Sequence, residues 1–259
     1  MSGFYQYNVV TFCNDAYYPF LIPFLKSLFA HSNDSINAVY VYNTGLHLDN
    51  EREVLSRFNF SEPPINFLPS GICADDLLKI HGTQWQKIVY SKAELFKNVI
   101  RQKSMLGMRP TAMIDVDTLF IGDIFKFYDV LPKQHTWEIS PCYRTFNLHI
   151  CSHIGSFVMA KATDWVTEEF IPRWIDIMTT MEQTPKESPS LSRAVFDFKL
   201  GLHGGKILSV PEYLFSSVIG FPVLDDTCAI HMKSDGANFC SVEERMNHPQ
   251  VEGYIRRYQ

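Results

Sequence analysis

Residues 112–124 read AMIDVDTLFIGDI, and the fold is best predicted from this stretch. Three apolar residues lead into Asp115-Val116-Asp117, which predicts a buried strand whose carboxyl end carries two carboxylates. Because side chains alternate along an extended chain, Asp115 and Asp117 point to the same side. Their hard oxygen atoms suit Mg²⁺ or Mn²⁺. The alternative is a solvated turn in which Asp117 caps nearby backbone N–H groups, since a D-x-D pair alone is a weak signal.

On both sides of this stretch, the chain alternates apolar strands with amphipathic helices. Strands are expected at 7–12, 38–42, 65–68, 111–115, 156–160, 206–210 and 229–232. Helices are expected at 18–31, 50–58, 90–104, 163–181 and from 188 toward 202. Ser91 with Glu94, and Ser241 with Glu244, have the spacing of capping boxes. The alternation predicts an α/β fold with a largely parallel sheet, in which ligands bind beyond the carboxyl ends of the strands.

The composition fits one globular domain. With 259 residues, 46% of them hydrophobic, the chain can bury a core without disulfide or metal staples. A net charge of −5 argues against a nucleic-acid partner, which needs a concentrated basic face. The six cysteines include no C-x-x-C pair, so we expect reduced thiols rather than a zinc-ribbon or thioredoxin-like site. No signal peptide or apolar span of about 20 residues is visible, so we expect no transmembrane segment and a cytoplasmic location.

Polar residues cluster around the end of the first expected strand. Thr11, Asn14 and Asp15 are expected to follow that strand, where they either hydrogen-bond a base or ribose or form an ordinary helix N-cap. Tyr17 is suited to stack on a uracil ring, and helix packing is an equally good interpretation. The segment is therefore a candidate nucleotide-binding turn.

Three basic side chains extend the candidate site. His231 ends the apolar run 228–230, and a neutral imidazole there can be a third metal ligand, although a lone histidine is more often structural. Lys233 comes two residues after His231, so we expect both side chains on the same side of the strand, where Lys233 can neutralise a leaving diphosphate. Lys92 is expected in the first turn of its helix, where the helix dipole disfavours a cation unless it meets a diphosphate. The alternative for Lys92 is a solvated side chain.

Four segments resemble, in the family's order, the glycogenin-like family 8 of nucleotide-sugar glycosyltransferases with the GT-A fold. They read VVTFCNDAYYPFLIPFLKSL at 9–28, YSKAELF at 90–96, AMIDVDTLFIGDI at 112–124 and AIHMKSDG at 229–236. The resemblance implies a Rossmann-like, mostly parallel central sheet flanked by helices. It also implies a donor site that comprises Thr11, Phe12, Asn14, Asp15, Tyr17, Lys92, Asp115, Val116, Asp117, Lys233 and Ser234, with Asp115, Asp117 and His231 as metal ligands.

The chain departs from the family's pattern at three places. The late motif H-x-x-G-x-x-K is reduced to His231, Lys233, Ser234 and Gly236, so the phosphate contacts there stay open. The N-S-G acceptor segment reads HIG at 153–155, which implies an acceptor pocket at His153, Gly155 and Ser156. The D-Q-x-x-L-N segment is matched at best by residues 197–200.

The expected function is sugar transfer from a nucleotide-diphosphate donor, with a UDP-sugar favoured, to a hydroxyl acceptor such as a glycan. Mn²⁺ or Mg²⁺ is expected to stabilise the leaving diphosphate together with Asp115, Asp117 and Lys233. The resemblance implies retention at the anomeric carbon, whereas an inverting enzyme would need a carboxylate base such as Asp197. We expect a single domain, 1–259, with a nucleotide-binding half at 1–122 and an acceptor-binding half at 123–259.

Three other functions compete with this interpretation. A sugar-phosphate nucleotidyltransferase normally has a glycine-rich loop after its first strand, and residues 12–15 contain no glycine. A metal-dependent phosphatase would also use paired aspartates, but its first aspartate normally follows the first strand and acts as the nucleophile. Asp15 lies too far from a D-x-D pair to fit that template. A non-catalytic nucleotide- or glycan-binding protein on a degenerate transferase fold would retain the same sequence features.

Overall fold

The chain divides into two compact units that are interleaved along the sequence. The computed structural model describes residues 6–58, 62–69, 84–102, 109–132, 136–143, 152–180, 187–201, 203–216, 223–233 and 241–259. The first unit takes the chain up to Pro69, Ile114–Lys133 and Pro211–Gln259, and the second takes Ser70–Met113 and Gln134–Val210. Neither unit ends at residue 122, and the assignment of nucleotide and acceptor halves stays a prediction.

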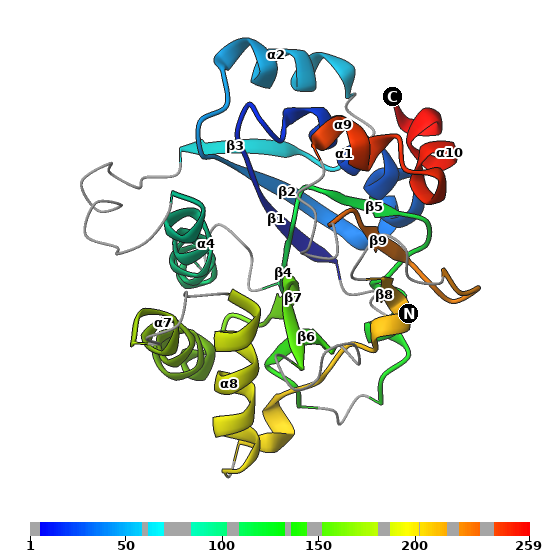
Figure 1. Ribbon diagram of the computed structural model, residues 1–259. Coiled ribbons are helices and arrows are strands. Elements are labelled where there is room, and N and C mark those ends of the chain that lie inside the picture. Colours follow the sequence, from blue (N-terminus) through cyan, green and yellow to red (C-terminus); the bar gives the residue numbers. More distant parts are fainter. Residues whose placement is uncertain are drawn as a thin grey trace. The chain divides into compact units, whose positions relative to one another are not determined.

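The first unit opens with three parallel strands and their connecting helices (Figure 1). In chain order these elements are β1 (Tyr7–Cys13), α1 (Tyr18–Ser32), η1 (Asn33–Ser35), β2 (Ile36–Asn43), α2 (Leu48–Arg57) and β3 (Ile65–Pro69). Asn8 of β1 lies opposite Ala38, and Val39 of β2 lies opposite Ile65. Every residue of β1 is buried, as expected of a parallel strand covered on both faces.

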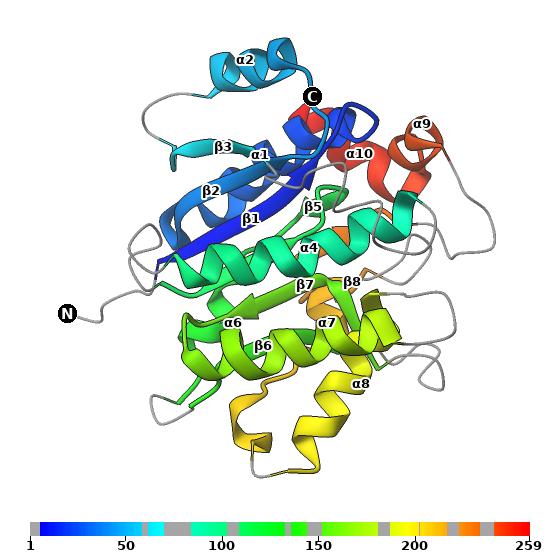
Figure 2. The same cartoon turned by 90° about the vertical axis from the view of Figure 1, so that its left-hand side faces the viewer.

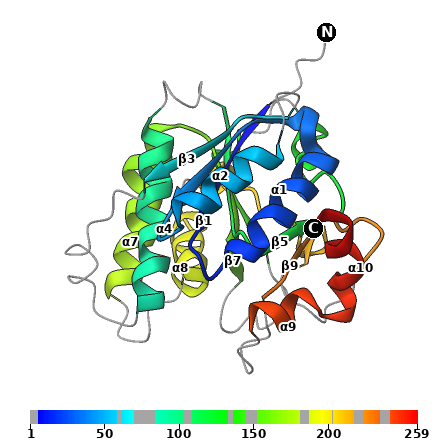
Figure 3. The same cartoon turned by 90° about the horizontal axis from the view of Figure 1, so that it is seen from above.

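The rest of the first unit packs around a small second sheet. Its elements are β5 (Thr118–Phe120), α6 (Lys126–Asp129), η4 (Glu212–Leu214), β8 (Phe215–Ser216), β9 (Ala229–His231), α9 (Val242–Met246) and α10 (Pro249–Tyr258). The strand order is β5-β9-β8. The Ser27 hydroxyl of α1 accepts a hydrogen bond from the Phe120 N–H at 3.1 Å, which ties α1 to β5. His31 Nε2 and the Tyr258 hydroxyl, 2.9 Å apart, join α1 to α10. Figure 3 shows these two helices of the first unit.

The second unit combines helices with an antiparallel strand pair (Figure 2). Its elements are α4 (Gln84–Arg101), β6 (Ile139–Tyr143), β7 (His153–Ala160), the π-helical η2 (Trp165–Phe170), α7 (Ile171–Thr180), α8 (Glu187–Lys199) and η3 (Gly204–Lys206). Trp174 of α7 is fully buried, and its indole N–H donates to the Glu187 carbonyl at 3.2 Å and to the Ser190 hydroxyl at 3.1 Å. These bonds fasten the start of α8 onto α7.

Strand β4 (Thr111–Ile114) completes a six-stranded sheet in the order β3-β2-β1-β4-β7-β6. All four residues of β4 are buried. The expected α/β class, with a mostly parallel central sheet flanked by helices, is confirmed. None of the helices in the described part of the chain has both the length and the apolar character required to cross a membrane.

Two local expectations are wrong. Helix α4 begins at Gln84, so Ser91 lies inside it and cannot be its N-cap, because the residues before Ser91 are themselves helical. The stretch 206–210 forms no named strand, and only Ile207 and Val210 make isolated bridges to β6. By contrast, the second capping box is present: Ser241 accepts from the Glu244 N–H at 3.1 Å, and the Glu244 carboxylate accepts from the Ser241 N–H at 2.6 Å.

Candidate metal centre

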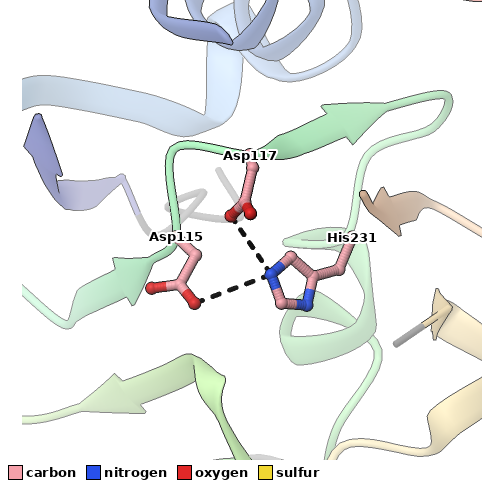
Figure 4. Close-up of side chains that lie close together, drawn as sticks. All are labelled: Asp115, Asp117 and His231. Atoms are coloured by element: carbon pink, nitrogen blue, oxygen red, sulfur yellow. Dashed lines mark hydrogen bonds and ion pairs between the residues drawn. The ribbon is translucent and has the colours of Figure 1, made fainter. Parts of the chain in front are cut away.

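The three residues expected to bind a metal come together in the first unit (Figure 4). Strand β4 ends just before Asp115, the chain turns through Asp117, and β5 begins directly afterwards. Strand β9 pairs with β5 in antiparallel register, which puts His231 opposite Thr118. The Met232 N–H extends this ladder by donating to the Asp117 carbonyl at 2.7 Å. The pairing therefore brings His231 beside Asp117, although 114 positions separate them in the sequence.

The spacing of the three side chains fits one divalent ion. His231 Nε2 lies 3.1 Å from Asp117 Oδ1 and 3.6 Å from Asp115 Oδ2. One ligand atom from each residue lies within 4.8 Å of the other two. Neighbouring ligands of an octahedral ion with bonds of about 2.1 Å are about 3.0 Å apart, and the two distances from His231 Nε2 are close to this spacing. Carboxylate oxygens with one imidazole nitrogen suit Mn²⁺ or Mg²⁺.

The site is largely shielded from water. The side chains of His231 and Asp117 are 2% and 8% exposed, whereas that of Asp115 is 21% exposed. The Phe215 ring lies 6.1 Å from the imidazole, centroid to centroid. Among the described residues, no group hydrogen-bonds His231 Nδ1, so strand pairing and ring packing hold the imidazole. Its Nε2 can donate to Asp117 when protonated and can be a metal ligand when not.

Arg245 also belongs to this site, although no sequence pattern pointed to it. Its Nη1 donates to Asp117 Oδ2 at 2.7 Å and to the Met232 carbonyl at 3.3 Å. The guanidinium carbon lies 4.8 Å from the Phe20 ring centroid and 5.3 Å from that of Tyr17. The capping box at the start of α9 was a sequence signal for the helix that carries Arg245. No spacing rule linked that helix to Asp117, which is 128 positions away.

The expected nucleotide-binding turn makes local structural bonds. Asn14 Oδ1 accepts from the Tyr17 N–H at 3.1 Å. Asp15 Oδ1 accepts from the His47 N–H at 2.8 Å and from Asn50 Nδ2 at 2.9 Å. These bonds are of the N-cap and turn kind that was the alternative for Asn14 and Asp15. Asp15 is nevertheless exposed, so a nucleotide contact there stays a prediction.

Two residues of the expected donor site, Thr11 and Phe12, lie within β1. Thr11 does not follow the strand, because β1 continues to Cys13. Its buried hydroxyl has no hydrogen-bond partner in the part of the chain that the structure describes. The Phe12 ring stacks on Tyr42, with centroids 5.6 Å apart. A donor contact by Thr11 or Phe12 remains a prediction.

The other donor-site candidates near the metal centre differ in accessibility. Val116, between the two aspartates, is buried. Lys233 is exposed two residues beyond His231, where its ammonium can reach a ligand in solvent. Ser234 lies outside the described residues. A phosphate contact by Lys233 stays a prediction.

Lys92 is placed differently from the expectation. It lies in the second unit, well inside α4 rather than in its first turn, and is buried. Its Nζ lies 3.2 Å from Glu187 Oε1 and 3.3 Å from Oε2. Gly155 makes room for this pair, because a Cβ at that position would come within 2.3 Å of the Glu187 side chain. Contact of Lys92 with a diphosphate stays a prediction, whereas its pairing with Glu187 is observed.

The expected acceptor residues also lie in the second unit, on β7. His153 is buried between two hydroxyls: Nδ1 lies 2.9 Å from Ser152 Oγ, and Nε2 lies 2.9 Å from Ser209 Oγ. Burial lowers the pKa of His153 to about 3, with a smaller contribution from nearby Lys199. The imidazole is therefore neutral at physiological pH. Ser156 is buried in the same strand, and binding of an acceptor there is not tested by these contacts.

Asp197, the expected candidate for a base, is held by two arginines. Arg173 Nη2 and Arg193 Nε each lie 2.9 Å from its carboxylate oxygens. The side chain of Asp197 is 24% exposed and lies near the end of α8. Arg173 pairs with Oδ2 and Arg193 with Oδ1, so both oxygens of this carboxylate have a cationic partner. Asp197 thus takes part in two observed ion pairs, and its role as a catalytic base stays a prediction.

Comparison with known proteins finds likeness in structure but not in sequence. No family model matches the chain, and no curated protein matches it by sequence. Among solved structures, an active-site mutant of LgtC has a TM-score of 0.62 at 11% identity, covering 95% of each chain. LgtC, a galactosyltransferase solved in complex with donor and acceptor sugar analogues, has a TM-score of 0.61 at 11% identity, with 97% and 96% covered.

Two larger glycosyltransferases share the fold. GlyE of Streptococcus pneumoniae TIGR4 has a TM-score of 0.63 at 13% identity over 98% of this chain, and the bifunctional WbbM has 0.62 at 10% identity over 98%. The chain spans 63% of the length of GlyE and 52% of that of WbbM. The resemblance found in the sequence is thus confirmed as one of fold: this chain has the GT-A-like α/β fold of solved glycosyltransferases.

Proposed function

We propose that this protein is a metal-dependent glycosyltransferase that transfers a sugar from a UDP-sugar to a hydroxyl group of a glycan. The observation that carries the proposal is the grouping of Asp115, Asp117 and His231 beyond the carboxyl end of β4. In a sheet of this class, ligands bind beyond the carboxyl ends of the strands. The structural likeness to glycosyltransferases supports sugar transfer as the chemistry of the site.

The main difficulty of this reaction is the charge that builds up on the departing diphosphate. A divalent ion held by Asp115, Asp117 and His231 would supply Lewis-acid stabilisation of that charge. Asp115 is the most exposed of the three, so it is the ligand that a donor from solvent can reach most easily. Lys233, exposed on the same segment as His231, adds a positive charge that can bind a phosphate oxygen.

The test is Mn²⁺-dependent release of UDP from a panel of UDP-sugars, with and without glycan acceptors. Asp115→Asn is the informative variant, because it removes charge from the least buried ligand and keeps its size. Loss of a comparable electrostatic partner lowers turnover roughly a hundred- to thousand-fold. Asp225→Asn, at an exposed turn in the first unit, is the matched control and should retain wild-type turnover.

The outcomes separate the proposal from its main rival. A non-catalytic binding protein would be stabilised by UDP or UDP-sugar in a thermal-shift assay but would release no UDP from any donor. Full metal-dependent turnover by Asp115→Asn would show that the catalytic centre lies elsewhere.

A further inference from the structure

Arg245 contacts a candidate metal ligand, but the proposed reaction assigns it no task. Its side chain is 10% exposed, and that of Asp117 is 8% exposed. The rings of Phe20 and Tyr17 lie within cation–π distance of the guanidinium. The Met232 carbonyl accepts a second bond from the same Nη1 that binds Asp117. The guanidinium is therefore held in place by several contacts besides the ion pair itself.

The two oxygens of Asp117 have different partners. Oδ1 faces His231 Nε2 at 3.1 Å, and Oδ2 faces Arg245 Nη1 at 2.7 Å. A divalent ion beside Oδ1 would share this carboxylate with the guanidinium. Since both side chains are largely buried, water screens the repulsion between the two cations only weakly.

We propose that Arg245 is the built-in counter-ion of the metal centre and makes binding of the divalent ion depend on the donor's diphosphate. This inference rests on the proposed function, because it assumes that Asp115, Asp117 and His231 bind a metal. The Arg245 guanidinium offsets part of the negative charge that Asp115 and Asp117 would otherwise offer to a metal ion. A divalent ion bound beside it therefore leaves an excess of positive charge that the donor's diphosphate can balance.

Removing the positive charge should therefore strengthen binding of the ion alone. Without Arg245, Asp117 Oδ2 loses the guanidinium that lies 2.7 Å from it, so more of the negative charge of this carboxylate is available to a divalent ion. The ion would also no longer be repelled by a guanidinium on the same carboxylate. Both effects strengthen binding of the ion alone, so the further increase in ion affinity caused by adding a nucleotide should be smaller.

The experiment measures Mn²⁺ dissociation constants, from the EPR signal of free Mn²⁺, with and without UDP. Arg245→Met removes the charge, and Arg245→Gln removes it while keeping N–H donors, so the second variant carries the test if the first does not fold. We expect each neutral variant to bind Mn²⁺ alone about tenfold tighter or more, with a correspondingly smaller enhancement by UDP. Arg245→Lys keeps the positive charge, so its Mn²⁺ affinity should stay closer to that of the wild type than the affinity of either neutral variant does.

Arg257→Met, which removes an exposed arginine of α10, is the matched control and should not change Mn²⁺ binding. Thermal unfolding in EDTA establishes that each variant is folded. If the folded neutral variants bind Mn²⁺ no tighter than the wild type, or if Arg245→Lys behaves as they do, the counter-ion role is wrong. If the wild type binds no Mn²⁺ even with UDP, the proposed metal-dependent function fails as well. The two failures are thus distinguishable.

Discussion

Replacing Asp117 with asparagine should destabilise the protein as well as impair its metal site. The substitution keeps the size of the side chain, and from the sequence alone folding should be nearly unaffected. The structure leads to a different prediction, because Asp117 is the carboxylate partner of the buried Arg245 guanidinium at 2.7 Å. Breaking a buried ion pair by removing one partner costs about 3–5 kcal/mol. An asparagine oxygen can still accept one hydrogen bond, worth about 1 kcal/mol, so we expect a net loss of about 2–4 kcal/mol.

This loss corresponds to a fall in melting temperature of roughly 4–16 °C for a chain of this size. The assay is thermal and urea unfolding in EDTA, so that no metal contributes to stability. Asp117→Asn combined with Arg245→Met removes both charges and should be more stable than Asp117→Asn alone. The exposed Asp225→Asn should unfold as the wild type does. A wild-type melting temperature for Asp117→Asn would refute the claim that this ion pair supports the fold.

Two further predictions concern the second unit. Lys92→Met removes the cation from the largely buried Glu187 carboxylate and should lower the free energy of unfolding by about 3–5 kcal/mol, whereas adding Glu187→Gln should recover part of the loss in urea unfolding. His153 has a folded-state pKa of about 3, below the ordinary value of 6.5, so the unfolded chain binds a proton that the folded chain excludes. The contribution of His153 to stability is therefore complete above about pH 6.5 and falls by about 1.4 kcal/mol per pH unit as the pH drops toward 3. Urea unfolding at pH 7 and pH 5 measures this pH dependence. If His153→Asn loses as much free energy of unfolding between these two pH values as the wild type does, the prediction is wrong.

The sequence carried enough information to predict the centre of the fold. The apolar run before Asp115 predicted β4, because a buried parallel strand needs apolar residues on both faces. His231 was predicted as a partner of Asp115 and Asp117, and the pairing of β9 with β5 places it there. These predictions succeeded because each depends on a strand with its own local signal.

The surroundings of these residues could not be predicted in the same way. Arg245 reaches Asp117 through the packing of α9 beside α1, and no local pattern reports such a contact. Lys92 was expected at a helix N-terminus because Ser91 and Glu94 have capping-box spacing, yet the helix begins earlier and places Lys92 against Glu187. Spacing rules detect local hydrogen bonds, whereas the partner of a buried charge is decided by tertiary packing.

The most direct test of the metal centre is an anomalous-scattering map from crystals grown with Mn²⁺ and UDP. We predict one Mn²⁺ peak within about 2.0–2.3 Å of carboxylate oxygens of Asp115 and Asp117 and of His231 Nε2, with the diphosphate on its open side. A UDP molecule bound with its diphosphate elsewhere, or a Mn²⁺ peak that does not touch Asp115, Asp117 and His231, would contradict this prediction.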